Sequence, residues 1–417
     1  MKFYSKLIGI IAAYGVTVWA FEALDINDCP QLPSRSRPTS VHDLRVDDIE
    51  VIAALGDSVS AGMLAKNINS SYVSMSDFIE YRGVSWSMGG DLDAPSIARY
   101  IKHFRPDLYG ASVGQKPARL CPDTFFCLDS EHTPEIDVLN AAQSGATSKE
   151  LPEQVDYLIK SIGKDTELAN KWKMINVFIG FNDASISCLP GKNASEFKAN
   201  VKGALEYLIE NVDYAFINLI GIMHYNDLVY LTDTEPTYKR KFQDNSINLL
   251  DYECYCCTQP GAGTSFIGEH VSQYNQVLDS IAKEMSGTLI SDLVAPIMGK
   301  LLKNIAVVYQ PMNTLISTVP YNALSNVDGY HPNVIGYSYL SRELWNQMFL
   351  TQNEKAQSSS FDASTPLYCP TANDRLRTCK TIFKAPILRQ SNSDNLQWWG
   401  VKTKDDAPAR LEEHFGI

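Results

Sequence analysis

The stretch at residues 51–62, VIAALGDSVSAG, constrains the fold more than any other part of the sequence. An apolar run stops abruptly at Gly56-Asp57-Ser58, and small residues follow. This pattern predicts a buried parallel strand that ends in a tight turn and leads into a helix. Ser58 would then lie beside a helix N-terminus, where backbone N–H groups favour a developing negative charge. That position suits a nucleophile, although the triplet alone is equally typical of a turn or a helix cap.

Apolar segments alternate with amphipathic ones along the rest of the chain. Strands are predicted at residues 49–55, 136–142, 173–180, 214–221 and 288–293, and helices at residues 96–104, 149–161, 195–211, 269–285 and 334–349. This alternation predicts a mostly parallel sheet covered by helices on both faces, with a site at the carboxyl ends of the strands. Residues 25–46 are rich in Pro, Ser, Arg and Asp, and we expect them to cover the surface outside the core.

Three further segments carry the groups that a nucleophilic serine needs. His331 precedes the last predicted helix and is the expected general base, with Asp328 three residues upstream to orient its ring. Asn182 follows a predicted strand, and its side-chain amide is a neutral donor that can bind an oxyanion. Gly145 also follows a predicted strand, and its backbone N–H can face a site without interference from a Cβ. Each segment alone is at least as consistent with a turn or a helix cap, and for Asn182 the turn is the better interpretation, so the prediction rests on the four together.

In their residues and in their order along the chain, these segments resemble the motifs of the GDSL, or SGNH, hydrolase family. The matching blocks are Gly56-Asp57-Ser58, Asn140-Ala141-Ala142-Gln143-Ser144-Gly145, Gly180-Phe181-Asn182-Asp183 and Asp328-Gly329-Tyr330-His331. One departure is Val59, which stands where the family name has Leu and is expected to affect packing only. The segment at residues 81–91, the acidic-lined cysteine cluster at 254–257 and the closing loop at 369–379 resemble the phospholipase B branch. The resemblance covers residues 49–379.

The resemblance implies an α/β fold, a three-layer α/β/α sandwich with a mostly parallel central sheet. It implies that Ser58 is the nucleophile, His331 the base and Asp328 its orienting partner. The oxyanion hole would comprise the backbone N–H groups of Ser58 and Gly145 and the side chain of Asn182. No cofactor and no metal are expected. Gly89 and Gly90, which resemble an oxyanion glycine pair, are placed in a branch-specific loop instead.

The phospholipase B branch implies a serine esterase acting on glycerophospholipids and lysophospholipids, presented at a membrane or micelle surface. Two alternatives stay open: an esterase for acetylated carbohydrates or other small esters on the same scaffold, and a catalytically silent lipid-binding protein. The aromatic residues Tyr81, Trp86 and Phe104 either line an acyl site or pack in the core. The net charge of −12, with no run of Lys and Arg, argues against nucleic acid as a partner. The oligomeric state is left open.

The first 20 residues predict the compartment. Lys2 and Lys6 precede a short apolar run that is typical of a secretory signal, an uncleaved anchor being the alternative. We therefore expect a secreted protein with a signal peptide at residues 1–20, a leader at 21–48, the hydrolase domain at 49–380 and a tail at 381–417 without an anchor. Asn69 and Asn193 begin glycosylation sequons.

Nine cysteines in a secreted chain predict disulfides. The expected bridges are local, near Cys121 and Cys127, within the 254–257 cluster, and between Cys369 and Cys379. Because the number is odd, one thiol is left free or pairs between chains. Zinc is the alternative for the cluster, but no histidine pair at metal-ligand spacing accompanies it.

Overall fold

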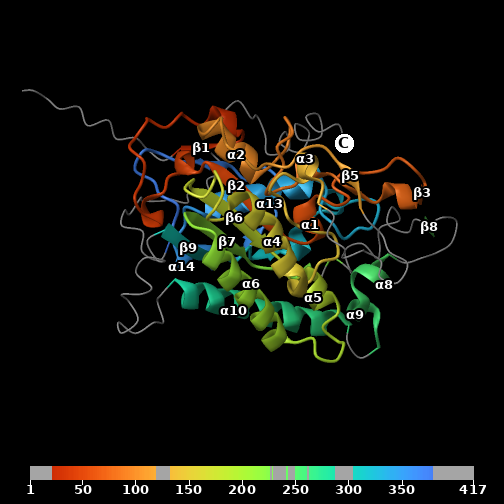
Figure 1. The fold of residues 1–417 in the computed structure, drawn as a ribbon. Coiled ribbons are helices and arrows are strands. Elements are labelled where there is room, and N and C mark those ends of the chain that lie inside the picture. The colour runs from red at the N-terminus through yellow and green to blue at the C-terminus, as the bar shows by residue number, and fades with distance from the viewer. Residues whose placement is uncertain are drawn as a thin grey trace, which may run out of the picture.

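A four-stranded parallel sheet forms the centre of the computed structural model, which describes residues 21–118, 132–225, 228, 241–242, 249–260, 263–286 and 304–378. The strand order is β2-β6-β7-β9 (Figure 1), and the strands are β2 (Val51–Gly56), β6 (Lys173–Phe178), β7 (Ala215–Ile220) and β9 (Ile305–Gln310). All four strands are buried along their whole length. Burial on both faces explains why their sequences are mainly apolar and do not alternate. The exceptions are the buried polar residues Lys173, Asn176, Asn218 and Gln310.

Helices cover both faces of this sheet, so the predicted three-layer α/β/α sandwich is confirmed. On one face lie α4 (Leu151–Ile162), α6 (Ala194–Asn211) and α10 (Gly263–Met285), and on the other α2 (Ile97–Phe104) and α13 (Val334–Gln347), as Figure 1 shows. The shorter helices are α1 (Ser58–Ala61), α3 (Pro134–Asp137), α5 (Phe181–Ser185), α8 (Leu250–Glu253), α9 (Tyr255–Thr258) and α14 (Gln352–Lys355). Nearly every residue of α13 is buried, because further chain covers its outer side.

Paired strands outside the central sheet join distant parts of the chain. They are β1 (Phe21–Ala23) with β12 (Leu367–Cys369), β10 (Thr314–Leu315) with β11 (Ser359–Ser360), β3 (Tyr72–Val73) with β8 (Lys241–Phe242), and β4 (Ile79–Glu80) with β5 (Lys116–Pro117). The β1–β12 pair is antiparallel and places Phe21 opposite Cys369. The two ends of the described chain therefore close against one another.

Two strand predictions differ from the structure. Residues 136–142 do not form a strand: Pro134 starts the short helix α3, and the chain beyond it forms only a single bridge between Asn140 and Ala54 of β2. The Asp137 carboxylate stabilises that helical turn by accepting from the Thr133 N–H. The strand β9 was not predicted, and the strand predicted at residues 288–293 lies outside the described residues.

The prediction that residues 25–46 stay outside the core is wrong for their last part. Val41, Leu44 and Val46 are fully buried within the main hydrophobic cluster. Their apolar side chains are spaced along two short 3-10 turns, at Val41–Asp43 and Val46–Asp48, and His42 and Asp43 between them are only partly buried. A composition average over the segment concealed this pattern.

The disulfides are less local than predicted. Cys369 bonds Cys29, 340 positions away, and does not bond Cys379, because the β1–β12 pairing brings the first two together. Within the cluster, Cys254 bonds Cys257 as a local bridge, whereas Cys256 bonds Cys188. Cys121, Cys127 and Cys379 lie outside the described residues.

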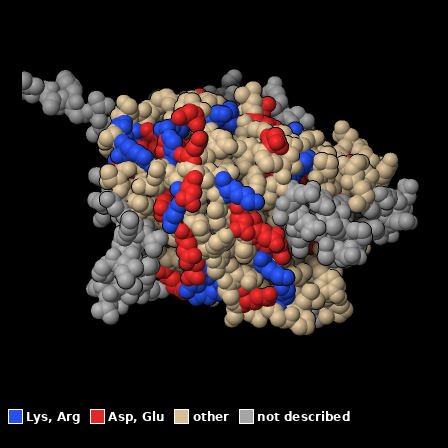
Figure 2. Space-filling model, viewed as in Figure 1, with Lys and Arg blue, Asp and Glu red and all other residues tan. Residues whose placement is uncertain are grey.

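Acidic and basic side chains are intermingled on the face of the molecule that Figure 2 shows, and neither sign dominates it. Several ion pairs on this side join helices, such as Lys198 and Lys202 of α6 with Glu284 of α10. Across the part of the chain that the structure describes, no helix is long and apolar enough to cross a membrane.

Candidate active site

The nucleophile candidate lies where the first central strand ends. β2 stops at Gly56, Asp57 caps the following turn by accepting from the Val59 N–H at 3.1 Å, and Ser58 begins α1. A Cβ on Gly56 would lie 2.6 Å from the Phe178 carbonyl oxygen, so only glycine allows this approach of β2 and β6. The side chain of Gln154 secures the same position by hydrogen bonding both the N–H and the carbonyl of Gly56 at 2.8 Å.

Ser58, His331 and Asp328 form a continuous chain of hydrogen bonds. The Ser58 Oγ lies 2.7 Å from His331 Nε2, and His331 Nδ1 lies 2.6 Å from Asp328 Oδ2. Because the carboxylate only accepts, Nδ1 carries the proton and Nε2 is left to accept from the serine hydroxyl. The side chains of His331 and Asp328 are almost completely buried, at 2% and 0% exposure. The geometry has the form of a nucleophile, a base and an orienting acid.

The turn that holds His331 is built around the same aspartate. Asp328 Oδ1 accepts from the backbone N–H groups of Tyr330 and His331, at 2.9 and 3.2 Å, which leaves Oδ2 for the imidazole. Gly329 between them has a φ of 67°, a left-handed conformation that favours glycine. The motif therefore determines the ring's position locally, before any tertiary contact is made.

Gly145 and Asn182, the other oxyanion candidates, lie on segments that are bonded to each other. Asn182 Nδ2 donates one of its two protons to the Ala146 carbonyl at 2.8 Å, which leaves the second proton available. Gly145 has a φ of 83°, and among the described residues its N–H and that of Ser58 donate to no protein group. The Gln143 N–H bonds the Gly56 carbonyl at 3.1 Å, so the Gly145 segment runs beside the strand end that carries Ser58.

Two buried carboxyls support this arrangement, and the sequence reasoning gave neither a role. Burial raises the pKa of Asp57 to about 7, although the nearby His331 opposes the rise. Burial also raises the pKa of Asp183 to about 6, against the effect of its hydrogen bonds from the Ser148 N–H and Oγ at 2.9 and 2.5 Å. Asp183 thereby joins α5, which carries Asn182, to the segment that follows Gly145. Both aspartates belong to the sequence motifs that predicted the site, and this position was the only indication in the sequence that they have a role.

A buried arginine holds the Gly145 segment from the other side. Arg82 donates to the carbonyls of Asn140 and Ala142 at 3.1 and 2.8 Å, and its charge is balanced by Glu80 at 2.7 Å. Glu80 in turn accepts from the Ser144 hydroxyl at 2.6 Å. Because breaking one partner of a buried ion pair is costly, this network fixes the backbone that presents the Gly145 N–H.

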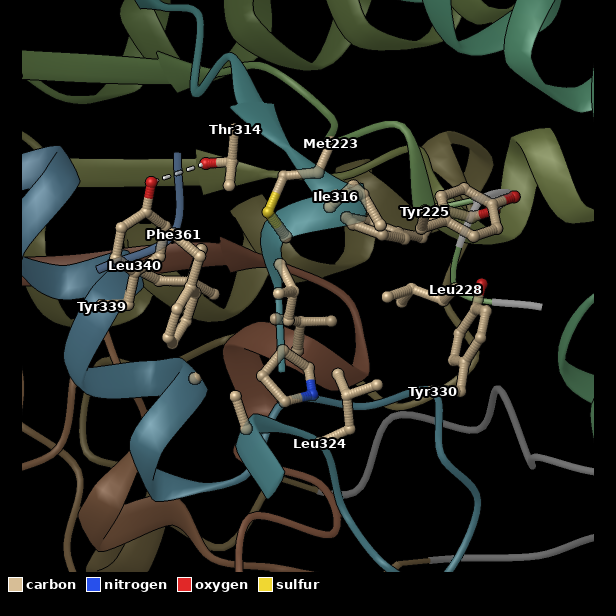
Figure 3. Close-up of a pocket in the computed structure, with 16 residues that line it drawn as sticks. Met223, Tyr225, Leu228, Thr314, Ile316, Leu324, Tyr330, Tyr339, Leu340 and Phe361 are labelled. Atoms are coloured by element: carbon tan, nitrogen blue, oxygen red, sulfur yellow. Dashed lines mark hydrogen bonds between the residues drawn. The ribbon is translucent and has the colours of Figure 1, made fainter. Parts of the chain in front are cut away.

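An apolar pocket opens next to the serine and the histidine. Val59 follows Ser58 in the chain, and Tyr330 and Pro332 flank His331; all three line the pocket. Figure 3 shows Tyr339, Leu340 and Phe361 on one side of this space and Tyr225, Leu228 and Tyr330 on the other. The expectation that Val59 affects packing only is therefore incomplete, because its side chain contributes to the pocket wall.

The tyrosines of the pocket present ring surface and keep their hydroxyls bonded to protein groups. The Tyr339 hydroxyl lies 3.2 Å from Thr314 Oγ1, the bond drawn in Figure 3, and 3.0 Å from Ser359 Oγ. The Tyr225 hydroxyl donates to the Phe181 carbonyl at 3.2 Å. Burial raises the pKa of Tyr225, Tyr330 and Tyr339 above the usual range, so the rings stay neutral. The pocket suits an apolar ligand.

The aromatic residues offered by the sequence lie elsewhere. Trp86 is fully buried against Phe178, Phe104 stacks on Trp345, and Tyr81 is no part of the pocket wall. The residues that line the pocket come instead from several segments between Val59 and Phe361, and no pattern in the sequence indicates that these segments meet.

The remaining site predictions have a clear position in the structure. Gly89 and Gly90 donate their N–H groups to the carbonyls of Ser85 and Ser112, so neither is free to bind an oxyanion. Asn69 and Asn193 are exposed, as a glycan would require, and Asn193 also caps α6.

A third carboxyl near the histidine was not predicted. Glu253, at the end of α8, places its Oε1 3.8 Å from His331 Nδ1. Together with Asp328 these side chains offer ligand atoms within 4.8 Å of one another, a spacing that suits a metal ion. His331 Nδ1 already donates to Asp328, so binding a cation here would break the hydrogen bond that orients the imidazole. The only signal in the sequence was the acidic residue beside the cysteine cluster.

The comparisons with known proteins agree with the arrangement of these motifs. The sequence model of the GDSL-like lipase/acylhydrolase family matches residues 52–344. The chain is 30% identical over 354 residues to "Phospholipase B1, membrane-associated" of Rattus norvegicus, covering 82% of this chain and 22% of that protein. It is 28% identical over 408 residues to the Homo sapiens protein of the same name, covering 91% and 25%. The chain thus spans about a quarter or less of these relatives.

Solved structures resemble the chain only loosely. An acetylxylan esterase from Geobacillus stearothermophilus matches with 13% identity and a TM-score of 0.35, over 74% of this chain and 98% of that one. An extracellular lipase from Streptomyces rimosus matches with 15% identity and a TM-score of 0.29, over 69% and 94%. With the family model covering most of the described chain, the protein belongs to the GDSL-like lipase/acylhydrolase family, in its phospholipase B-like branch.

Proposed function

We propose that this protein is a serine esterase that removes fatty acyl chains from glycerophospholipids and lysophospholipids. The observation that carries the proposal is the pocket beside Ser58 and His331, whose wall is almost entirely apolar, as small-molecule sites for apolar ligands are. An acetyl group would leave most of that apolar surface unused, whereas a long acyl chain would bury it. The similarity to proteins named phospholipase B1 supports the same substrate class.

In the proposed mechanism, Ser58 Oγ attacks the acyl carbonyl carbon while His331 Nε2 takes the hydroxyl proton. Asp328 holds the imidazole ring and stabilises the imidazolium that forms. The negative charge on the carbonyl oxygen is stabilised by the backbone N–H groups of Ser58 and Gly145 and by the Asn182 amide. His331 then gives its proton to the departing glycerol oxygen, which leaves an acyl-enzyme. A water molecule activated by His331 releases the fatty acid by the reverse sequence.

The decisive experiment compares substrates on the purified full chain and on a Ser58→Ala variant. Lysophosphatidylcholine, diacyl phosphatidylcholine and an acetylated xylo-oligosaccharide are offered separately, and released acids are quantified by mass spectrometry. We expect fatty acid from both phospholipids and a loss of about 10⁶-fold in kcat for Ser58→Ala, as when a triad acts as a unit. Release of acetate alone would assign the scaffold to small esters. Failure of a fluorophosphonate to label Ser58 would favour a silent lipid-binding protein.

The cellular setting is part of the proposal. We propose a secreted protein with a signal peptide at residues 1–20, a leader at 21–48, the hydrolase domain at 49–380, a tail at 381–417, and glycans on Asn69 and Asn193. The disulfides support an oxidising compartment. Intact mass and N-terminal sequencing of protein from the culture medium, before and after glycosidase treatment, test these assignments. An N-terminus at Met1 would contradict the cleaved signal.

A further inference from the structure

A buried carboxyl lies behind the histidine and has no role in the proposed mechanism. The Glu253 side chain is 2% exposed, and its Oε1 lies 3.8 Å from His331 Nδ1, too far for a hydrogen bond. Within the described residues, neither Oε1 nor Oε2 of Glu253 accepts a hydrogen bond. A buried ionised carboxylate without a donor is very unfavourable, so this side chain needs another way to be satisfied.

The neighbouring groups determine the protonation state of Glu253. Asp328 lies in the same cluster, and its carboxylate is already committed to His331 and to two backbone N–H groups. Burial, and then the negative charge of Asp328, raise the pKa of Glu253 well above its usual range. Other groups facing this region are His331 and Tyr330 from the same loop, with Asp57 across the site. One oxygen of Glu253 lies within 4.8 Å of one oxygen of Asp328. Two buried carboxyls at such a separation favour a state in which they share one proton.

We infer that Glu253 is a positioning residue, a neutral carboxylic acid that donates its proton to the Asp328 carboxylate and extends the chain Ser58–His331–Asp328 by one member. This inference rests on the proposed function, since it assigns a further residue to the same site. The Glu253 proton partly neutralises Asp328, so the imidazole is oriented by one shared negative charge and not by two. Such a charge-assisted bond also fixes the carboxylate in the plane that His331 requires.

The chain holds Glu253 in position covalently. Glu253 ends α8, and the next residue, Cys254, bonds Cys257 across a single turn. Cys256 within that turn bonds Cys188, which lies shortly after α5 and its Asn182. The cysteine cluster thus joins the Glu253 turn to the element that carries an oxyanion donor.

The test uses Glu253→Ala and Glu253→Gln in the full chain, with the exposed Glu269→Ala on α10 as the matched control for loss of one carboxyl. Glutamine is neutral and has an N–H to donate, so it keeps the proposed bond, whereas alanine removes it. We expect Glu253→Ala to lower kcat/KM about 10- to 100-fold, the range of a hydrogen bond to a charged group, with KM little changed. Glu253→Gln should restore most of that loss. Thermal melts show whether each variant is folded.

The pH profile of kcat/KM separates positioning from a purely structural role. Without the Glu253 proton, the full charge of Asp328 acts on His331, so the acidic limb should move upward by about half a pH unit or more in Glu253→Ala. It should stay in place in Glu253→Gln. An acidic limb that does not move in Glu253→Ala would overturn the inference. A limb that moves to lower pH in both variants would also overturn it, because that shift indicates an ionised Glu253 in the wild type. Hydrolysis by Ser58→Ala would instead overturn the proposed function.

Discussion

A tryptophan in place of Ile316 tests whether the pocket beside Ser58 binds an acyl chain. Ile316 lines the pocket from a short 3-10 turn and is 4% exposed. The pocket wall is almost entirely apolar, so each acyl methylene that enters the pocket moves from water to an apolar surface. Each one buried contributes about 0.8 kcal/mol, so kcat/KM should rise about fourfold per methylene until the pocket is full.

With tryptophan at position 316, the rise in kcat/KM should end at a shorter acyl chain. An indole in place of the isoleucine side chain displaces about two to three methylenes, which corresponds to about 2 kcal/mol and roughly a 30-fold loss for the longest chains. Acetyl and butyryl esters should react almost as in the wild type, because they do not reach the filled part. The adjacent exposed residue, Ser317→Trp, is the matched control and should change neither end of the series.

The assay is hydrolysis of monomeric p-nitrophenyl esters of increasing chain length, kept below their micellar concentrations. Overpacking can cost about 1–3 kcal/mol of stability, so thermal melts accompany the kinetics. A uniform fall in kcat/KM of the tryptophan variant across all chain lengths would indicate a general disturbance of the site. A wild-type series that does not rise with chain length would refute the reasoning about the pocket itself.

Three further perturbations test other parts of the structure. Asn182→Ala should lower kcat by about 10²–10³-fold with esters of any length, because one oxyanion donor is lost; a loss below fivefold in steady-state assays would remove Asn182 from the hole. Asp57 has a folded pKa of about 7 against 3.8 unfolded, so the folded state keeps its proton longer and the free energy of unfolding falls as pH rises from 4 to 7, by roughly 4 kcal/mol. Urea titrations at pH 4.5 and 7.5 measure this fall, which Asp57→Asn should lack. An equal change in the free energy of unfolding between the two pH values in wild type and variant would contradict the prediction. Replacing Cys29 and Cys369 by serine should destabilise the protein by several kcal/mol, with a loop-closure limit of about 6 kcal/mol for 340 residues; an unchanged denaturation midpoint would show that this disulfide contributes little to stability.

Local patterns in the sequence predicted most of the central fold. The apolar runs that became β2, β6 and β7 and the helical spacing of apolar residues in α4 and α10 were visible because each reflects the burial of that segment alone. The errors occurred where a tertiary contact outweighed the local pattern. Residues 136–142 resemble a strand but have a proline-started turn, and Val41 and Leu44 lie in the core within a polar segment.

The individual site residues were predictable for a similar reason. Ser58 follows the end of β2, Asn182 lies on the helix that follows β6, and His331 precedes α13, and a parallel sheet brings its strand ends to one edge. Gly145 was placed by a strand predicted at residues 136–142, which the structure does not contain. The Asp328–His331 bond is within one turn of chain, so the sequence alone implied it. In contrast, nothing local relates Glu253 to His331, because a charge beside a cysteine cluster is usually solvated.

The sequence by itself determined the strand–helix alternation, the turn chemistry around Gly56 and Gly329, and the residue types of the site, because these depend on neighbours within a few positions. Only the tertiary structure decided which cysteines pair, which side chains enclose the apolar pocket, and that Glu253 lies against Asp328. Most of these features join distant segments, such as Cys188 with Cys256, 68 positions apart, and Cys29 with Cys369, 340 positions apart. The packing of the whole sheet and its helices sets such distances, and no short window of sequence contains them.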